Sequence, residues 1–596
     1  MWLPRRLFKI PYVVTKINVI DIETYGRDKL TAYCCCIVYK NKKIVSYGDK
    51  CIIKIFEYIF SNCDNFSIFF AHNLTFDGLI ILNSIDNSIE IVENGTLLRG
   101  CSIYSMSLKR NGKIIKFQCS SKILPLSLKD IAFRLNLPKK MDLDHSSINS
   151  SNFMDRNIME SVIEYCKRDV YITQLFLSKI NDELKNVYPG WWIWSYTVSG
   201  LALKIFDSMF NKFIKLNIKT EDDNLIRPAY YGGRCEVFGN PIKGDFIFHY
   251  DFSGMYTNRL KESFPYGDFT ILDKPKDINK MGFYHVKVRS DINPIPILPY
   301  RCETTKKLLF PNGEFSGFYW YEELDLFLKN GGIILEIYSA VVFNKEDYIF
   351  KDFSDFCIEN RKKSQLNKIL WKLIPNSFIG RLGLKGEYEK TIILDNDKYN
   401  PFDYDVISDK KINNQWLVTI RCNEINKTSN NVIYPAIITS KARIVWWTNA
   451  LEIIKNGGRL LYCDTDSMFV SFNRNIIGEK HGSIEWINND KDTIIDKACF
   501  AGNKAYALMV KGETTIKIKG IKDNNISFDD FENKFYNSES INFKFDLFEK
   551  KLFNMKISEI IKKISFIDYD KRHFIENKKK TESITIFENT LLNEKH

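Results

Sequence analysis

An apolar run at residues 17–23 ends in two acids, and this pattern predicts a β-strand with a charged end. Asp21 and Glu23 are two positions apart, so both side chains leave a strand on the same face. That placement suits one metal site. The alternative is a strand end with two solvated acids.

Two further segments supply acids from elements that are otherwise apolar or helical. Residues 72–78, HNLTFDG, contain Asp77, and a helical pattern over residues 159–177 contains Tyr165 and Asp169. Tyr165 and Asp169 are four positions apart and share a helix face. If these acids converge with the pair on the strand, four carboxylates can hold two divalent metals that activate a water, and the tyrosine can orient it.

A second set of acids lies farther along the chain, again at the ends of apolar segments. Residues 246–248 lead to Asp251, which predicts a strand that ends in an acid and a turn. Residues 458–462 lead to Asp464 and Asp466, whose alternate spacing predicts a hairpin tip. Two metal ions held by such acids stabilise both the attacking and the leaving oxygen of nucleotidyl transfer. The alternative for the DTDS segment is a polar turn.

A basic helix is predicted between these acids, over residues 353–378. It carries Arg361, Lys362, Lys368 and Lys372 ahead of Asn376-Ser377. Lys368 and Lys372 are four apart and share one face. Such cations neutralise the charge of a triphosphate, whereas a solvated helix face is the alternative.

Composition bounds these interpretations. At 596 residues the chain exceeds one typical core, so two or more units are expected, with a boundary near residues 189–192. A net charge of +12 suits a surface that holds a polyanion, and it serves solubility equally well. The fourteen cysteines lack paired spacing with nearby histidines, so we expect no structural zinc. No apolar stretch is long enough to span a bilayer, so no membrane partner is expected.

The motifs along the chain resemble those of family B DNA polymerases. DIET, HNLTFD and YCKRD resemble the three exonuclease motifs of the DEDDy 3′-5′ proofreading class, and DFSGMY, KLIPNSFIG and YCDTDS resemble polymerase motifs A, B and C. Five more segments resemble motifs of the protein-primed branch found in phages and linear plasmids: YYGG at 230–233, TSKAR at 439–443, KAY at 504–506, SL at 127–128 and KMDL at 140–143.

The resemblance implies an α/β and α+β multidomain fold, in which an RNase H-like 3′-5′ exonuclease domain precedes a right-hand polymerase domain of palm, fingers and thumb. The implied boundaries are 1–187 for the exonuclease, 188–260 and 428–522 for the palm, 351–384 for the fingers, and 523–596 for the thumb and C-terminal tail. Two insertions resemble terminal-protein regions. The first, 261–350, would bind the priming protein, and the second, 385–427, would be a hairpin that encircles template and supports strand displacement.

The resemblance also implies roles for individual residues. The implied catalytic residues are Asp251, Asp466 and Asp464 for polymerisation and Asp21, Glu23, Asp77, Asp169 and Tyr165 for exonucleolysis. All of these except Asp464 and Tyr165 would bind metal, with two Mg²⁺ or Mn²⁺ ions in each site. The implied nucleotide-binding residues are Tyr256, Arg361, Lys368, Lys372 and Asn376. The implied DNA-binding residues are Asn73, Phe76, Ser127, Leu128, Lys140, Tyr230, Gly232, Gly233, Thr439, Arg443, Lys504 and Tyr506.

Several of these residues carry a physical expectation. Tyr256 would lie under the incoming sugar, where its ring excludes a 2′-hydroxyl. Gly232-Gly233 would let backbone approach a phosphate closely, and Arg443, Lys504 and Tyr506 would grip the primer strand. The alternatives are a turn and ordinary surface charges.

Two motifs depart from the family pattern. Ile379 stands where a tyrosine usually contacts the nascent base pair, and Pro375 interrupts the helix of motif B, which predicts a kink. Gly254 and Thr257 replace the serine and proline common in motif A, so the geometry of that turn is expected to differ.

The function implied is a template-directed DNA polymerase with a proofreading exonuclease, which uses dNTPs and replicates a linear DNA by protein-primed initiation and strand displacement. Its partners would be a DNA template-primer and a terminal protein. Because the first strand begins near Ile17, we expect the terminal protein to be separate or the chain to be part of a longer precursor. The expected location is a mitochondrion, or otherwise the cytoplasm of a host that carries a phage or linear plasmid. The alternative is a catalytically decayed, DNA-binding replication scaffold.

Overall fold

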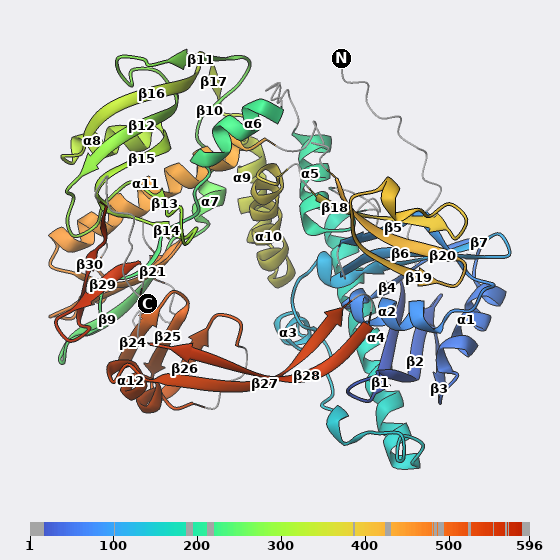
Figure 1. Cartoon of the computed structure of the whole chain (residues 1–596). Coiled ribbons are helices and arrows are strands. Elements are labelled where there is room, and N and C mark those ends of the chain that lie inside the picture. The colour runs from blue at the N-terminus through green and yellow to red at the C-terminus, as the bar shows by residue number, and fades with distance from the viewer. Residues whose placement is uncertain are drawn as a thin grey trace.

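The computed structural model describes residues 17–99, 102–185, 187, 195–210, 220–385, 388–422, 431–479, 481, 485–486, 494–521, 526–551, 554–566, 569 and 571–586. A seven-stranded sheet near the N-terminus lies at one side of the molecule, and a five-stranded sheet lies at the other (Figure 1). Helices stand between them. The boundary predicted near residues 189–192 lies outside the described residues.

The N-terminal sheet has the strand order β3-β2-β1-β4-β7-β6-β5. Its strands are β1 (Asn18–Tyr25), β2 (Thr31–Tyr39), β3 (Lys42–Tyr47), β4 (Phe66–Ala71), β5 (Glu90–Arg99), β6 (Ser102–Arg110) and β7 (Lys113–Cys119). Strand β1 pairs antiparallel with β2 and parallel with β4. The strand predicted at residues 17–23 is therefore confirmed.

Helices cover this sheet on both faces. They are α1 (Cys51–Asn62), α2 (Leu74–Ser84), α3 (Leu128–Arg134) and α4 (Arg156–Leu184). Helix α4 packs on β1 and β2 and contains the whole predicted helix 159–177. Its buried positions recur at helical spacing, as at Val162, Cys166 and Asp169, because one face of the helix lies on the sheet.

The five-stranded sheet has the order β23-β9-β22-β21-β8. Its strands are β8 (Cys235–Val237), β9 (Phe246–Asp251), β21 (Arg459–Asp464), β22 (Ser467–Phe472) and β23 (Glu485–Trp486), and the long helix α11 (Ile433–Lys455) packs against it. Both sequence predictions for this region are confirmed: a strand ends at Asp251, and β21 and β22 form a hairpin around Thr465-Asp466.

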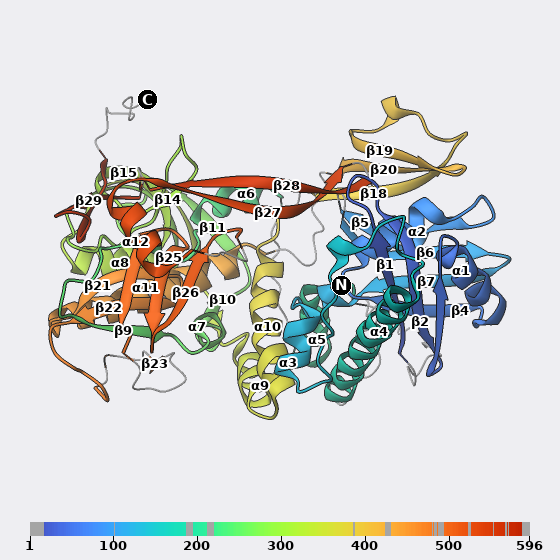
Figure 2. The same ribbon diagram turned by 90° about the horizontal axis from the view of Figure 1, so that it is seen from below.

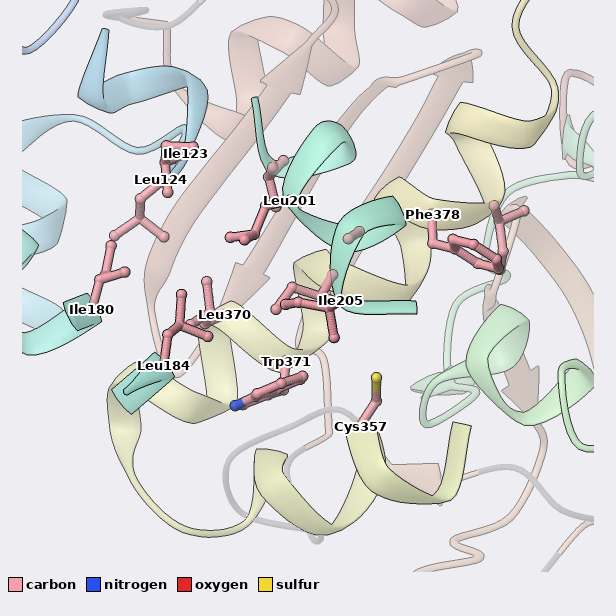
Figure 3. Close-up of a cluster of buried hydrophobic side chains, with 14 of the residues drawn as sticks. Ile123, Leu124, Ile180, Leu184, Leu201, Ile205, Cys357, Leu370, Trp371 and Phe378 are labelled. Carbon is pink, nitrogen blue, oxygen red and sulfur yellow. The ribbon is translucent and has the colours of Figure 1, made fainter. Parts of the chain in front are cut away.

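Helices between the two sheets share one apolar core with the N-terminal sheet. Ile180 and Leu184 of α4 lie near Leu201 and Ile205 of α5 (Val198–Met209), and Leu370, Trp371 and Phe378 complete the cluster with Cys357 (Figure 3). The last four come from α9 (Lys351–Arg361) and α10 (Gln365–Leu382). The single helix predicted over residues 353–378 is wrong, because Ser364 starts a new helix by accepting a hydrogen bond from the Asn367 N–H at 3.1 Å.

The predicted first insertion, 261–350, forms a sheet of its own. Strands β11 (Phe269–Asp273), β16 (Ile333–Phe343), β12 (Gly282–Ser290) and β15 (Asn312–Trp320) lie side by side in that order, and the C-terminal β31 (Thr585–Ile586) adds to β15. Short strands β10 (Phe264–Pro265), β13 (Tyr300–Arg301), β14 (Leu308–Leu309) and β17 (Glu346–Asp347) flank it. Helix α8 (Tyr321–Lys329) packs between this sheet and α11.

The predicted second insertion contains a hairpin, as expected. Strands β18 (Tyr388–Asp395), β19 (Val406–Ile412) and β20 (Gln415–Cys422) form a sheet in the order β18-β20-β19; residues 386–387 and 423–427 lie outside the described part. The Gln415 amide exchanges hydrogen bonds with the Ile91 backbone, donating to its carbonyl at 3.1 Å and accepting from its N–H at 2.7 Å. The hairpin is therefore attached to β5 of the N-terminal sheet.

The C-terminal part spans the molecule. Strands β24 (Lys497–Gly502), β25 (Ala505–Val510) and β26 (Glu513–Ile518) form a sheet beneath α12 (Phe528–Tyr536). The hairpin of β27 (Ser540–Lys551) and β28 (Asn554–Ser565) then crosses toward the N-terminal sheet (Figures 1 and 2), where Ile557 N–H donates to Arg27 O at 2.9 Å. After it, β29 (Arg572–Ile575) and β30 (Lys580–Ser583) form a small hairpin beside β8. No helix in the described ranges is long and apolar enough to cross a membrane.

Candidate active sites

Four carboxylates meet at the middle of the N-terminal sheet, as predicted. Asp21 and Glu23 come from β1, Asp77 from the first turn of α2, and Asp169 from α4. The Ile22 N–H donates to Asp77 Oδ1 at 3.1 Å, which fixes the start of α2 against β1. Glu23, Asp77 and Asp169 are buried and Asp21 is half-buried, so the two acids at the end of β1 are not a fully solvated pair.

The pKa values of this cluster are those of acidic groups held close together and away from water. Burial raises the pKa of Asp21, and together with repulsion from neighbouring acids it raises the pKa of Glu23 and Asp77 well above their usual range. Burial and the nearby Asp21 raise the pKa of Asp169 to about 7. Its Oδ1 has no hydrogen-bond partner among the described residues. A buried set of oxygen donors of this kind fits a divalent cation such as Mg²⁺.

Lys140 enters this site, although sequence reasoning had placed it only on DNA. Its ammonium group contacts Asp169 Oδ2 and lies 4.4 Å from the centre of the Tyr165 ring. Burial raises the pKa of Tyr165 to about 12, so its phenol keeps its proton. Tyr165 thus lies one helical turn from Asp169, in the predicted position.

Two residues of this site were missed from the sequence. Cys166 Sγ lies 3.4 Å from Asp21 Oδ2, and His145 Nδ1 lies 3.8 Å from Glu23 Oε2. Cys166 is three positions before Asp169 on a helix, and that spacing was a usable signal. His145 begins a single 3-10 turn, His145–Ser147, which is too short to show a periodic pattern.

The second acidic set is brought together by backbone pairing. Ser467 of β22 faces Asp251 of β9, and the Phe252 N–H donates to the Asp466 carbonyl at 2.8 Å. Thr465 takes a left-handed conformation at φ 65°, so the turn is tight. The two predicted metal ligands, Asp251 and Asp466, therefore lie at adjoining strand ends.

Cations surround these acids. Lys504 Nζ lies 2.9 Å from Asp464 Oδ2, and this contact raises the pKa of the lysine. Burial raises the pKa of Asp466, while Lys372 and Lys504 oppose that shift. Oxygen donors beside lysines suit divalent ions that carry phosphate.

A cavity of about 810 Å³ opens beside the turn of motif A. Ser253, Gly254, Arg361 and Lys368 are among its lining residues. Lys368, Lys372 and Asn376 form an exposed stripe on α10, as the spacing predicts. Gly254 has φ 65° and begins the helix α7 (Met255–Arg259), which explains a glycine at this departure from the family pattern.

The remaining motif B and motif A residues lie close by. Helix α10 runs through Pro375 without ending, and Ile379 is buried in the apolar core. Tyr256 is mostly buried; burial raises its pKa to about 12, with a contribution from nearby Asp466. Thr257 accepts, through its carbonyl, a hydrogen bond from Ser354 Oγ at 2.6 Å.

The two glycines of the YYGG segment have different surroundings. A Cβ on Gly233 would lie 2.7 Å from Thr465 Cγ2 and 3.1 Å from its Cα, whereas a Cβ on Gly232 would meet nothing within 4 Å. Close contact with the DTDS turn therefore requires a glycine at position 233, and the predicted approach of this segment to a phosphate stays a prediction.

Arg443 is a buried structural cation. Its Nε and Nη2 donate to the two carboxylate oxygens of Glu323, each at 2.7 Å, and its Nη1 donates to the Tyr231 and Gly232 carbonyls at 3.0 and 3.2 Å. Both residues of the pair are buried, and the predicted grip of Arg443 on a primer strand stays a prediction. Glu323 had no sequence signal.

Other predicted DNA contacts divide by exposure. Leu128, Thr439 and Tyr506 are buried: Leu128 lies in the apolar core, and Tyr506 packs among Tyr462, Phe469 and Phe500. Ser127 Oγ caps α3 by accepting from the Asp130 N–H. Asn73 is exposed, and Phe76 and Tyr230 are partly exposed. For all of these residues a contact with DNA stays a prediction.

Comparison with known proteins gives the family. A sequence profile described as "DNA polymerase type B, organellar and viral" matches residues 152–453, just over half of the chain. The chain belongs to the organellar and viral type B DNA polymerases. The resemblance inferred from the motifs is thereby confirmed.

Named relatives agree with this family. A probable DNA polymerase of Podospora anserina is 25% identical over 432 residues, covering 65% of this chain and 35% of its own length. A probable DNA polymerase of Neurospora intermedia is 26% identical, covering 54% of this chain and 39% of its own. The chain therefore spans less than half the length of these two relatives. The DNA-directed DNA polymerase of Enterobacteria phage PRD1 is 25% identical and is covered over 86% of its length, with 87% of this chain.

The fold of this type B polymerase is also that of a solved structure. Phi29 DNA polymerase, solved with primer-template DNA and incoming nucleotides, superposes with a TM-score of 0.69 over 91% of this chain and 98% of that chain, at 16% identity. The predicted fold class is confirmed at this level: a multidomain polymerase fold of the phi29 type.

Proposed function

We propose that the chain is a template-directed DNA polymerase with a 3′-5′ proofreading exonuclease, which replicates a linear DNA by protein-primed initiation and strand displacement. One observation carries the polymerase part. The Phe252 N–H to Asp466 carbonyl hydrogen bond sets Asp251 beside the DTDS turn, with Lys372 and Lys504 nearby.

In this proposal Asp251 and Asp466 hold the metal ions, and Asp464 supports them. When bound, the ions stabilise the charge on the attacking and leaving oxygens of nucleotidyl transfer. Lys368 and Lys372 neutralise the triphosphate, Arg361 closes the cavity beside motif A, and Tyr256 excludes a 2′-hydroxyl. Arg361 and Lys368 line the cavity beside motif A, and Lys372 and Tyr256 lie near Asp466, which supports the assignment.

The exonuclease part uses the four buried carboxylates. Asp21, Glu23, Asp77 and Asp169 are proposed to hold divalent metal, and Tyr165 to hold the attacking water through its protonated phenol. Lys140 orients Asp169 through their direct contact. Four acids from three elements converge here, although burying their charges together costs free energy. This arrangement favours a catalytic site over a structural role.

The priming and strand-displacement parts rest on the two predicted insertions. The β11-β16-β12-β15 sheet is the proposed surface for a terminal protein, whose hydroxyl would act as the first nucleophile. The β19–β20 hairpin, fixed to β5, is proposed to bound the template path. A mitochondrial location, or the cytoplasm of a host that carries a phage or linear plasmid, remains a prediction.

Extension of a labelled primer on a defined template with dNTPs and Mg²⁺ tests the proposal. We expect longer product from the native chain, none from Asp466→Asn, and loss of primer degradation alone from Asp169→Asn. Labelled nucleotide should attach covalently to a terminal protein in a primer-free reaction. A DNA complex that never yields product would favour the alternative, a decayed DNA-binding scaffold.

A further inference from the structure

We propose that the Asp21–Glu23 end of the carboxylate site also binds a thiophilic or borderline transition metal ion, of the Zn²⁺ and Co²⁺ class, with Cys166 and His145 as added ligands. The inference deepens the proposed exonuclease. It adds sulfur and nitrogen donors to a site whose function requires only oxygen.

The thiol of Cys166 lies close to the oxygen atoms of Asp21. Cys166 Sγ lies 3.4 Å from Asp21 Oδ2 and 3.5 Å from the Asp21 carbonyl oxygen. One ligand atom each from Asp21, Glu23 and Cys166 lies within 4.8 Å of the other two. An ion between them would touch one thiolate and two carboxylates, which together offer three protein ligands of the types that zinc accepts.

The imidazole of His145 lies near Glu23 and is partly exposed. His145 Nδ1 lies 3.8 Å from Glu23 Oε2, and its ring packs edge-on against Tyr165 at 5.2 Å between centroids. Asp144 Oδ1 accepts from the Ser146 N–H at 3.0 Å and caps the short turn that carries the histidine. The His145 side chain is 42% exposed, so a small rotation can bring the imidazole to an ion held by Glu23.

The opposite end of the cluster is arranged differently. Lys140 contacts Asp169 Oδ2 and supplies a positive charge there, while Asp169 Oδ1 is buried and lacks a partner among the described residues. The ammonium group of Lys140 is thus the cation next to Asp169. The sulfur and nitrogen donors suited to a soft metal ion, Cys166 and His145, lie beside Asp21 and Glu23. No comparable group of cysteine or histidine with acids occurs at Asp251, Asp464 and Asp466 in the described part of the chain.

Donor type decides which ions gain from this arrangement. Mg²⁺ prefers oxygen, whereas thiolate and imidazole favour Zn²⁺ and Co²⁺. On binding, a metal–sulfur bond forms as the Cys166 S–H bond breaks, and the proton passes to solvent. A Zn²⁺ ion bound in this way would occupy Asp21 and Glu23 and block Mg²⁺-dependent cleavage, leaving polymerisation much less affected.

Co²⁺ titration of the full chain, followed by absorption, tests the site. We expect a sulfur-to-cobalt charge-transfer band that saturates at one equivalent. Cys166→Ser should lose the band and Cys63→Ser, a buried thiol outside this cluster, should keep it. His145→Gln changes an exposed residue and should weaken Co²⁺ binding by about tenfold or more, because even outer-shell partners of metal ligands contribute about 10- to 100-fold. Binding without the band, or a band that survives in Cys166→Ser, would overturn the proposal.

A second readout separates this proposal from the exonuclease itself. The Zn²⁺ concentration that halves each protein's own Mg²⁺-dependent cleavage should be higher for Cys166→Ser and His145→Gln than for the native chain. Equal Zn²⁺ sensitivity in all three would count against the inhibitory role. A cobalt–sulfur band in a chain that never degrades primer would refute the exonuclease and leave the metal site standing.

Discussion

Lys504 and Asp464 form an ion pair beside the DTDS turn, with 2.9 Å between Nζ and Oδ2. Asp464 ends β21, whereas Lys504 lies in the turn between β24 and β25 of another sheet, and the Lys504 N–H also donates to the Tyr462 hydroxyl at 3.0 Å. The KAY segment is therefore attached to the hairpin that carries the proposed metal ligands. A lysine in this position orients the carboxylate next to Asp466.

Replacing Lys504 with alanine should weaken metal use by the polymerase site. Asp464 lies next to the proposed ligand Asp466, and outer-shell partners at metal sites typically contribute about 10- to 100-fold to metal affinity or activity, so we expect a loss of about that size. The measurement is primer extension against Mg²⁺ concentration. Lys497→Ala, which removes an exposed pair with Asp529, is the matched control and should extend primer normally. Identical Mg²⁺ curves for both variants would contradict the role given to Lys504.

Alanine at Gly233 should disturb the DTDS turn, whereas alanine at Gly232 should not. The added Cβ at position 233 overlaps Thr465, and overpacking of this kind costs about 1–3 kcal/mol. Thermal unfolding and primer extension should both decline for Gly233→Ala. Gly232→Ala meets open space and should keep the native Tm; equal Tm values for the two variants would show that the contact relaxes freely.

Removing Glu323 should destabilise the chain strongly. Glu323→Ala leaves Arg443 buried without its carboxylate, and breaking a buried pair from one side costs about 3–5 kcal/mol. Denaturant unfolding of the intact chain measures this change. Glu314→Ala breaks a partly exposed pair with Arg289 and a longer one with Lys287, and it should cost at most about 1 kcal/mol. A Glu323→Ala chain as stable as Glu314→Ala would mean that Arg443 finds another partner.

His72 should make the folded chain sensitive to acid. Its Nε2–H donates to the Leu126 carbonyl at 2.9 Å, and burial lowers its pKa to about 4 from an ordinary 6.5. The unfolded chain binds the proton first on acidification, so stability from the neutral imidazole is complete above pH 6.5 and falls as the pH drops toward 4. His72→Gln should therefore lose less Tm between pH 7.5 and 5 than the native chain. The exposed His573→Gln is the control and should keep the native pH slope.

Tyr256 is predicted to select deoxynucleotides. Tyr256→Val should raise ribonucleotide incorporation relative to deoxynucleotide by about tenfold or more, because the smaller side chain no longer meets a 2′-hydroxyl. Single-nucleotide extension with matched dNTP and rNTP measures the ratio. An unchanged ratio of ribonucleotide to deoxynucleotide incorporation would show that Tyr256 does not exclude the 2′-hydroxyl.

The sequence predicted both acidic sets because each carboxylate ends or lines an apolar element, and such elements have a recognisable period. Asp21, Asp251 and the hairpin around Asp466 were placed correctly on that basis. The break between α9 and α10 was missed, since the capping Ser364 lies within an otherwise continuous helical pattern. The capping residue is a local signal of a helix start, and the prediction gave more weight to the helical periodicity around it.

The burial of Arg443, Leu128, Thr439 and Tyr506 was not predicted, for another reason. Each belongs to a motif that resembles a nucleic-acid contact, yet its side chain is buried by elements distant in sequence. Arg443 meets Glu323, 120 positions earlier, and no pattern in one sequence reports such a partner. His145 is the opposite case, because it lies at the carboxylate site although no periodic signal in the sequence marks it.

The buried cations of α11 bear on how this chain can be rearranged. Arg443 pairs with Glu323, and Lys441 pairs with Glu262 and Glu322, so all three acids come from residues 261–350. A segment that resembles an inserted module thus supplies counter-charges to the core helix. Evolution or protein engineering cannot exchange that module for a foreign one unless the replacement brings acids to the same positions, and its inheritance is therefore tied to that of α11.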